Sequence, residues 1–163
     1  MGRIETLTWI LITLLIAPLF AFTAVNYLPQ FDGFTVTGGS MEPEIKTGSL
    51  LFTHNVEAEK IEVGDTITFR DGDHFTTHKV ISKNSDNGEV SFRTQGIANE
   101  SPDPGIVTED ELRGRKLVSI PLLGYFIAWA GTTQGLLIVV VLPGTLLILL
   151  EAKNIVDEFR KEQ

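Results

Sequence analysis

Residues 74–95, His-Phe-Thr-Thr-His-Lys-Val-Ile-Ser-Lys-Asn-Ser-Asp-Asn-Gly-Glu-Val-Ser-Phe-Arg-Thr-Gln, carry the pattern from which the fold is best predicted. Residues 74–82 and 89–95 are rich in β-branched and aromatic side chains, which favour pleated, half-buried strands. Between them, Asn87-Gly88 is a pair that tolerates the positive φ angles of a type I′ turn. The stretch therefore predicts two antiparallel strands joined by a hairpin.

Short strand patterns continue on both sides of this hairpin. The same character recurs in residues 34–37, 49–53, 66–70 and 117–120. Glycines punctuate these runs as turns, whereas residues 97–105, with two prolines and few large apolar side chains, predict a loop. Many short strands at close spacing predict a mainly β fold, a small antiparallel barrel or sandwich over residues 31–120.

The composition narrows the classes of function. The chain has 163 residues, a formal net charge of −8 and 43% hydrophobic residues. The acidic balance argues against nucleic acid as a partner, because a surface that binds nucleic acid must neutralise phosphates with basic side chains. There are no cysteines, so disulfides, cysteine-based metal sites and a cysteine nucleophile are excluded.

The N-terminal part carries the first of two long apolar stretches. Residues 7–28 contain no charged side chain, and this stretch is long enough for a helix to cross a bilayer about 30 Å thick. A cleaved signal peptide is the alternative, since Ala21 and Ala24 are small residues near its end. Because the apolar run exceeds the usual ~7–15 residues of such a segment, we predict a retained membrane anchor at residues 1–30.

The second apolar stretch follows Lys116, after which the next charged residue is Glu151. Prolines and glycines predict an irregular first half up to residue 131, lying at the membrane interface. Residues 132–150 predict the span itself, with a kink at Pro143-Gly144 that membrane helices tolerate. A buried core helix is the alternative interpretation.

Two spans place both termini on one side of a membrane and the acidic β domain on the other. The predicted organisation is an anchor at residues 1–30, a β-rich domain at 31–120, a second apolar or transmembrane segment at 121–152 and a tail at 153–163. The tail carries basic residues, and Lys and Arg favour the cytoplasmic side. We therefore predict a multi-pass protein of the cell membrane with its β domain on the extracytoplasmic side.

Gly38-Gly39-Ser40-Met41-Glu42-Pro43 is the first candidate for chemistry. Its glycines let the backbone approach a substrate closely, but a serine hydroxyl is a poor nucleophile until a base takes its proton. A serine in a glycine-rich turn is most often an ordinary loop residue. The candidate imidazole bases are His54, His74 and His78.

The strand context limits what the histidines can do. His74 and His78 lie four positions apart, which in a strand separates their Cα atoms by about 13 Å, so we predict no metal site. His78 precedes Lys79, and neighbouring strand residues point to opposite faces of the sheet. Only one of these two bases can therefore face Ser40.

Four short motifs follow one another in a fixed order. They are Ser40-Met41-Glu42-Pro43, Gly64-Asp65 before Thr-Ile-Thr-Phe, His78-Lys79-Val80-Ile81, and Thr94-Gln-Gly-Ile-Ala-Asn99 with Asp103. Together they resemble the type I signal peptidases of the archaeal and endoplasmic-reticulum branch, over about residues 34–120. The resemblance implies a β-rich catalytic domain at the outer or lumenal face of a membrane, which removes signal peptides from exported proteins by cutting after small residues.

The resemblance also implies roles for individual residues. Ser40 corresponds to the nucleophile, His78 to the general base and Asp103 to the carboxylate that orients the imidazole. The His78 imidazole is expected to touch the Ser40 hydroxyl in space. The residues implied to bind substrate and oxyanion are Gly38, Gly39, Ser40 and Met41. The implied partners are signal peptides of preproteins, the lipid bilayer and the export machinery; no cofactor, metal or nucleic acid is implied.

Three positions depart from the family pattern. Ile97 stands where the branch usually has an aspartate, Gln95 replaces a common lysine, and Gly38 replaces a hydroxyl-bearing residue. One alternative is therefore a catalytically silent, membrane-tethered β module that binds exported chains. Another, a soluble relative with a Ser-Lys site, conflicts with the two apolar stretches.

Other acidic residues have simpler predicted roles. Asp65 follows a turn glycine and is expected to cap or form that turn. Glu42 is expected to hold the turn in which it lies. The run Glu109-Asp110-Glu111 is expected to form a solvated face or the start of a helix.

Overall fold

The computed structural model describes residues 3–28, 30–86 and 88–161. The chain divides into two compact units: a β unit, Phe22–Phe126, and a helical unit made of Met1–Ala21 and Ile127–Gln163. In the described part of the β unit, seven strands form one antiparallel sheet in the order β1-β2-β7-β3-β4-β5-β6. The prediction of a mainly β, antiparallel fold is confirmed.

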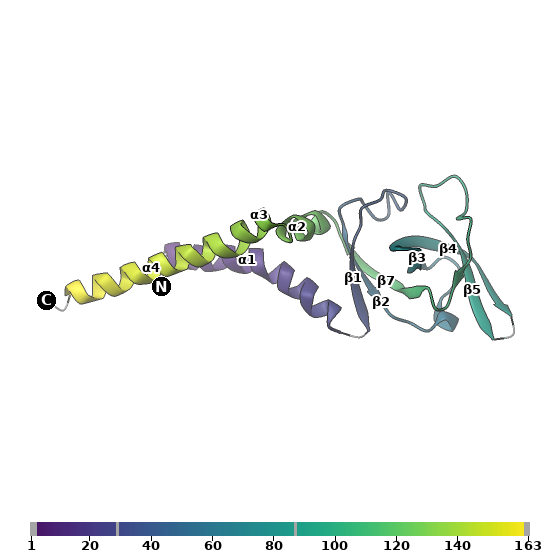
Figure 1. The fold of residues 1–163 in the computed structure, drawn as a ribbon, viewed down its shortest axis with the longest axis horizontal. Coiled ribbons are helices and arrows are strands. Elements are labelled where there is room, and N and C mark those ends of the chain that lie inside the picture. Colours follow the sequence, from purple (N-terminus) through teal and green to yellow (C-terminus); the bar gives the residue numbers. More distant parts are fainter. Residues whose placement is uncertain (1–2, 29, 87, 162–163) are drawn as a thin grey trace. The chain divides into compact units, whose positions relative to one another are not determined.

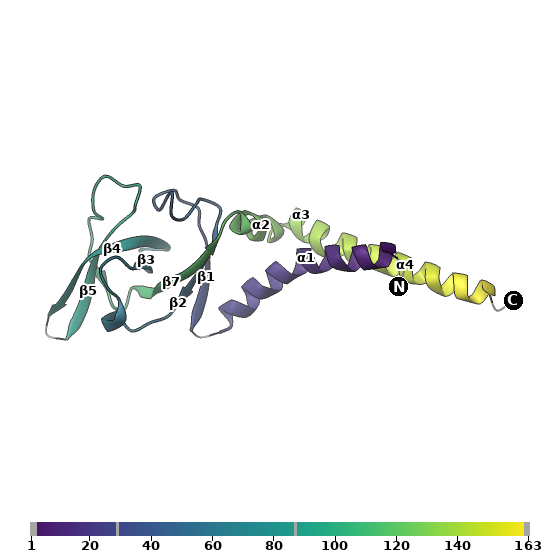
Figure 2. The ribbon, with the colours of Figure 1, turned by 180° about the vertical axis from the view of Figure 1, so that it is seen from behind.

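The sheet is curled rather than flat, so that β3, β4 and β5 turn away from β1 and β2 (Figure 1 and Figure 2). The strands are β1 Phe31–Thr35, β2 Leu50–His54, β3 Thr66–Asp71, β4 His74–Asp86, β5 Glu89–Gln95, β6 Val107–Thr108 and β7 Leu112–Ile120. Residues 97–105 form no strand or helix, as predicted for a loop. This loop and the one between β1 and β2 carry much of the candidate site.

The predicted hairpin is present as β4 and β5. Asp86 pairs with Glu89, so two residues connect the strands, and Gly88 has a φ of 90°. Asn87 lies outside the described residues, so the type I′ turn stays a prediction. β4 continues four residues beyond its predicted end, because polar residues pair along the ladder as far as the turn.

β7 is the strand that the sequence predicts least well. Only its last four residues are predicted, because residues 112–116 combine charged side chains with a glycine, and these are weak strand formers. In the sheet β7 lies between β2 and β3, and backbone pairing on both edges outweighs this low propensity. Two of its charged side chains form ion pairs: Arg115 lies 3.3 Å from Asp65, and Lys116 lies 2.8 Å from Glu44.

The acidic turns mostly agree with expectation. The Asp65 carboxylate accepts a 2.9 Å hydrogen bond from the Glu62 N–H and so holds its turn. Residues 109–111 form a turn that leads into β7, with Glu109 and Asp110 exposed. Of the two alternatives, the solvated face agrees with the structure and the helix start is wrong. The strand that follows gives this short run no room to continue as a helix.

Two apolar clusters stabilise the β unit. The larger consists of Ala58, Ile61, Ile67, Phe69, Val80, Val90, Phe92 and Val107. The smaller consists of Met41, Ile45 and Leu51, with Phe34 and Val36 packed against it. Because Met41 and Ile45 lie in the same loop as Ser40, between β1 and β2, the second cluster anchors that loop to the sheet.

The helix α2, Leu123–Ala130, begins against the turn that precedes β2. The Tyr125 N–H donates to the Gly48 carbonyl, and a Cβ added at Gly48 would lie 2.0 Å from the Tyr125 ring. A Cβ added at Gly124 would lie 2.3 Å from the Ser49 carbonyl oxygen. The prediction that residues 121–131 are irregular is therefore wrong for residues 123–130. Gly124 permits the helix to pack closely against Ser49 and does not interrupt it.

The helical unit contains α1, Arg3–Asn26, for most of its length, and a C-terminal series of helices. The series after α2 is α3 Thr133–Leu136, the π-helical stretch η2 Leu137–Val141 and α4 Leu142–Lys161. Pro143 has no N–H to donate to the carbonyl of Val139, and the wider π-helical stretch ends just before it. α4 also includes most of the predicted polar tail.

The segment Thr133–Lys153 is long and apolar enough to cross a membrane, judged by length and composition, with a mean hydropathy of 2.4. Only 17% of its apolar window is buried, which does not fit the alternative of a buried core helix. Among the described residues near the N-terminus, the apolar helix Ile12–Ala24 is shorter. The anchor at residues 1–30 and the arrangement of two spans stay predictions.

Candidate active site

Ser40 lies in the irregular loop between β1 and β2. Its carbonyl accepts a 2.8 Å hydrogen bond from the Ala98 N–H, which ties this loop to the one after β5. The turn itself is held by Glu42, whose Oε1 accepts from the Thr47 hydroxyl at 2.9 Å and from the Thr47 N–H at 3.2 Å. The N–H of Thr47, followed by its hydroxyl, lowers the pKa of Glu42 below its ordinary value. Glu42 therefore has the turn-holding role expected of it.

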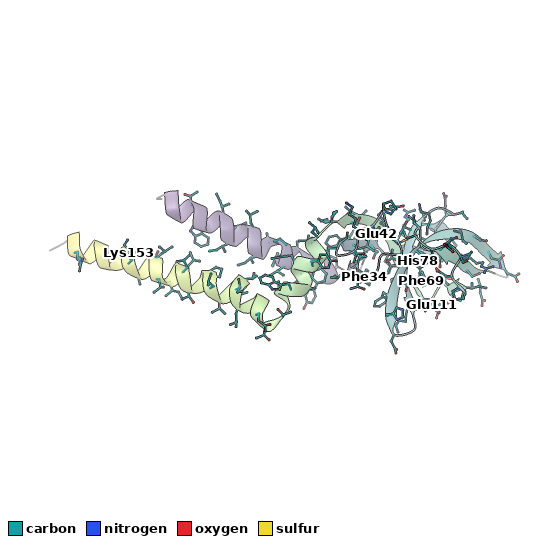
Figure 3. The ribbon with its side chains drawn as sticks, turned by 90° about the horizontal axis from the view of Figure 1, so that it is seen from above. Phe34, Glu42, Phe69, His78, Glu111 and Lys153 are labelled. Atoms are coloured by element: carbon teal, nitrogen blue, oxygen red, sulfur yellow. The ribbon has the colours of Figure 1, made fainter. Side chains whose placement is uncertain are left out.

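His78 lies within β4, opposite Ile67 of β3. Strand alternation turns His78 toward the buried side together with Val80, and its ring centroid lies 6.4 Å from that of Phe69 (Figure 3). The imidazole Nε2 lies 2.9 Å from Ser40 Oγ. The contact expected between Ser40 and His78 is therefore present.

Asp103 completes a chain of three side chains. Its Oδ2 lies 2.6 Å from Nδ1 of His78, and the two side chains are 20% and 8% exposed. Since a carboxylate is an acceptor only, the neutral imidazole must carry its proton on Nδ1 and donate it to Asp103. Nε2 is then the free acceptor that faces the Ser40 hydroxyl.

Lys79 points to the other side of β4. Its Nζ lies 3.1 Å from Glu44 Oε2, while Lys116 Nζ lies 2.8 Å from Glu44 Oε1. The hydrogen bond from Lys116, and then that from Lys79, lowers the pKa of Glu44 below its ordinary value. Of the two neighbouring bases, the imidazole meets Ser40 and the ammonium forms an ion pair elsewhere.

Two residues around the site carry roles that the sequence did not reveal. A Cβ added at Gly96 would lie 2.7 Å from the Ser40 carbonyl oxygen and 2.9 Å from Nε2 of His78, so glycine permits the approach of the two loops. Thr94, which is fully buried, donates its hydroxyl to Asp103 Oδ2 at 2.6 Å. Both belong to the Thr94–Asn99 motif, but nothing in the sequence distinguishes them from an ordinary strand residue and an ordinary turn residue.

Ile97 follows Gly96 on this loop and is 38% exposed. Because an isoleucine side chain can neither donate nor accept a hydrogen bond, this position supplies no second carboxylate beside Asp103. The carboxylate found against the imidazole is that of Asp103.

A groove of about 470 Å³ begins at Ser40. Residues 34–38 line one side and residues 74–77 the other, with Met41 also contributing. Gly38 lies in this lining, whereas Gly39 does not; a Cβ at Gly39 would instead lie 3.5 Å from the Thr47 hydroxyl. The structure thus brings three of the four predicted binding residues, Gly38, Ser40 and Met41, to one groove.

The other two histidines make no contact with Ser40, His78 or Asp103, although His74 is among the residues that line the groove. His74 is at the start of β4, exposed, with its Nε2 3.7 Å from Asp71 Oδ2, and His54 packs its ring 5.1 Å from that of Phe31. Within residues 3–28, 30–86 and 88–161, no group of three or more His, Asp or Glu side chains is placed to hold a metal ion. The arrangement around Ser40 supports nucleophilic chemistry with a positioned base.

No family model matches the chain. Signal peptidase I W of Bacillus subtilis (strain 168) is 32% identical over 92 residues, which cover 53% of this chain and 48% of that protein. The signal peptidase complex catalytic subunit SEC11C of Homo sapiens, like that of Canis lupus familiaris, is 38% identical over 79 residues, which cover 47% of this chain and 41% of the relative. The chain thus spans about half the length, or less, of these curated relatives. Over the matched stretch, the chain is a homologue of the type I signal peptidases.

Proposed function

We propose that this protein is a membrane-bound serine endopeptidase that removes N-terminal signal peptides from exported preproteins, cutting after small residues. The observation that carries the proposal is the chain of contacts from Ser40 Oγ to His78 Nε2 and from His78 Nδ1 to Asp103 Oδ2. The homology to signal peptidases supports the choice of substrate. Ser40 is the nucleophile, His78 the general base and Asp103 the group that orients the imidazole.

The reaction follows from this geometry. Nε2 of His78 takes the Ser40 proton as the oxygen attacks the scissile carbonyl, and the tetrahedral intermediate collapses as His78 returns that proton to the leaving amine. Water, activated by the same imidazole, then releases the acyl-enzyme. The Asp103 carboxylate holds the proton-accepting tautomer and stabilises the imidazolium that forms in each half of the reaction.

The oxyanion needs donors near Ser40. The backbone N–H of Ser40 is the proposed donor, since an N–H aimed at the developing charge stabilises it in the transition state. Gly38 carries no side-chain hydroxyl to assist, so the site depends on backbone groups. Gly38, where an added Cβ would meet nothing within 4 Å, also leaves space for the substrate backbone to approach Ser40.

The substrate binds as an extended strand in the groove beside residues 34–38. Main-chain hydrogen bonds to this segment supply affinity, in the manner of strand addition to an open edge. The groove lining includes Thr68 and Thr77, whose hydroxyls lie 2.7 Å apart, together with Val36 and Met41. These close-set side chains favour small substrate residues next to the cut.

We further propose that the protein is held in the cell membrane by two spans, with the β unit on the extracytoplasmic side. The apolar segment Thr133–Lys153 and the uncharged residues 7–28 support this topology. Signal peptides occupy the same bilayer, so membrane anchoring raises the effective concentration of substrate at the site. Association with the export machinery would deliver substrates to this face.

The test is cleavage of a purified precursor by the full-length protein in detergent, with the products identified by mass spectrometry. We expect one cut after a small residue at the end of the signal peptide, and none with Ser40→Ala. Ile97 favours a second candidate, a silent β module that binds exported chains without cutting them. Equal lack of cleavage by the wild type and Ser40→Ala, with precursor still bound, would replace the first proposal by the second.

A further inference from the structure

Thr94 lies at the end of β5 and has no exposed surface. Its hydroxyl is 2.6 Å from Oδ2 of Asp103, the same oxygen that lies 2.6 Å from Nδ1 of His78. In addition, the Asp103 N–H donates to the Thr94 carbonyl at 2.9 Å. Thr94 therefore holds Asp103 at two points, one on the backbone and one on the carboxylate.

These two hydrogen bonds close the loop of residues 95–102 at its base. Loops between strands have more conformational freedom than the strands they join, and a carboxylate rotates easily about its last torsion. Since a carboxylate can only accept, the Thr94 hydroxyl must donate to it. One oxygen of Asp103 is thereby fixed between a strand hydroxyl and the imidazole.

We propose that Thr94 is a positioning residue of the active site. By fixing the Asp103 carboxylate, it keeps His78 in the tautomer and orientation in which Nε2 accepts the Ser40 proton. Because Ile97 supplies no other carboxylate, the orientation of His78 depends on Asp103 alone. The Thr94 hydroxyl is the side-chain donor that fixes the Asp103 carboxylate. The expected effect of Thr94 on kcat rests on the proposed function. The expected effect of Thr94 on the tautomer and orientation of His78 does not require that the protein cleaves a substrate.

The kinetic test compares three full-length variants in detergent. Thr94→Val removes the hydroxyl at nearly constant volume, and water cannot replace it because the position is fully buried. A lost hydrogen bond to a charged group predicts that kcat falls about 10- to 100-fold, with KM within about twofold. Thr94→Ser, which retains the donor, should stay within about threefold of the wild type.

Thr53→Val is the matched control. Thr53 is also fully buried, but its hydroxyl lies 3.5 Å from the Asp32 carbonyl, away from the site. It should lose thermal stability much as Thr94→Val does while keeping the wild-type kcat. If Thr94→Val does not fold, Thr94→Cys, whose thiol is a weak donor, replaces it.

The second readout is independent of cleavage. In protein labelled with ¹⁵N-histidine, the His78 resonances, assigned by their loss in His78→Ala, report which ring nitrogen carries the proton. The wild type and Thr94→Ser should give a protonated Nδ1 with a downfield N–H signal. Thr94→Val should give a mixture of tautomers and lose that signal.

The two readouts separate this inference from the proposed function. If the wild type cleaves and Thr94→Val cleaves equally well with unchanged His78 resonances, the positioning role is overturned while the proposed function stands. If the wild type does not cleave, the proposed function fails and the resonances alone decide. A loss of kcat that Thr94→Ser does not rescue, with the His78 resonances unchanged, also overturns the positioning role.

Discussion

A methyl group added at Gly96 would collide with two parts of the candidate site at once. The Cβ of Gly96→Ala would lie 2.7 Å from the Ser40 carbonyl oxygen and 2.9 Å from Nε2 of His78. Optimal contacts between such atoms are about 3.5 Å, so the neighbours must move by roughly 0.5–1 Å. One neighbour is backbone, so Ser40 itself must shift. A misplacement of about 1 Å costs about 100-fold in rate, so we expect kcat to fall about 10- to 100-fold, or about 1.4–2.7 kcal/mol.

The assay is cleavage of a precursor at several concentrations, with thermal unfolding measured on the same preparations. The crowding itself should lower the free energy of unfolding by about 1–3 kcal/mol. Gly105→Ala is the matched control, because it lies on a neighbouring part of the loop and its Cβ would meet nothing within 4 Å. If Gly96→Ala folds and keeps the kcat of Gly105→Ala, the two loops are not packed as closely as the structure indicates, and the reasoning fails.

Three further results are expected. His78→Ala should abolish cleavage, whereas Lys79→Ala should retain most of it, because the ammonium pairs with Glu44; the opposite ranking would make lysine the base. Asp103→Ala should lower kcat by about 10³- to 10⁴-fold in the same assay, since the imidazole loses its orienting carboxylate, and near-normal turnover would remove Asp103 from the mechanism. The pKa of Glu44 is lowered from 4.5 by Lys116 and then Lys79, so its ion pairs add stability above about pH 4.5 that is lost as the pH falls through the lowered value. Glu44→Gln should flatten this part of the pH profile of unfolding by less than about 1 kcal/mol, because the pairs are partly exposed, and a steeper acid loss in the variant would contradict the assignment.

The parts of the fold that were predictable are those whose signal is local. In β5 and β3, β-branched and aromatic residues recur within a few positions, and a glycine turn bounds each run. β7 gives no such signal over residues 112–116, because its strand conformation depends on neighbours from β2 and β3 that are distant in sequence. α2 was not predicted because a glycine in a sequence usually indicates the interruption of a helix. In the structure, Gly124 instead allows the helix to pack closely against the Ser49 backbone.

Some residues of the candidate site could be predicted from the sequence, and others are revealed only by the folded chain. Ser40 stood out as a hydroxyl in a glycine-rich turn, whereas the family resemblance selected His78 from three histidines and pointed to Asp103. Thr94 is indistinguishable in sequence from a threonine that simply favours a strand. Gly96 owes its importance to atoms contributed by two other segments, so only the folded chain reveals why no larger residue fits there.

His78 and Lys79 are consecutive residues on β4 that serve opposite faces of the sheet. Strand pairing has a period of two, so a slip of a single residue exchanges the faces. Deletion of one residue ahead of this point in β4 would therefore bring Lys79 to the place of His78, facing the serine oxygen, and move the imidazole to the opposite face of the sheet. Which residue accepts the serine proton is therefore set by the number of residues between the start of β4 and the site, since alternate residues of the strand face the same side of the sheet.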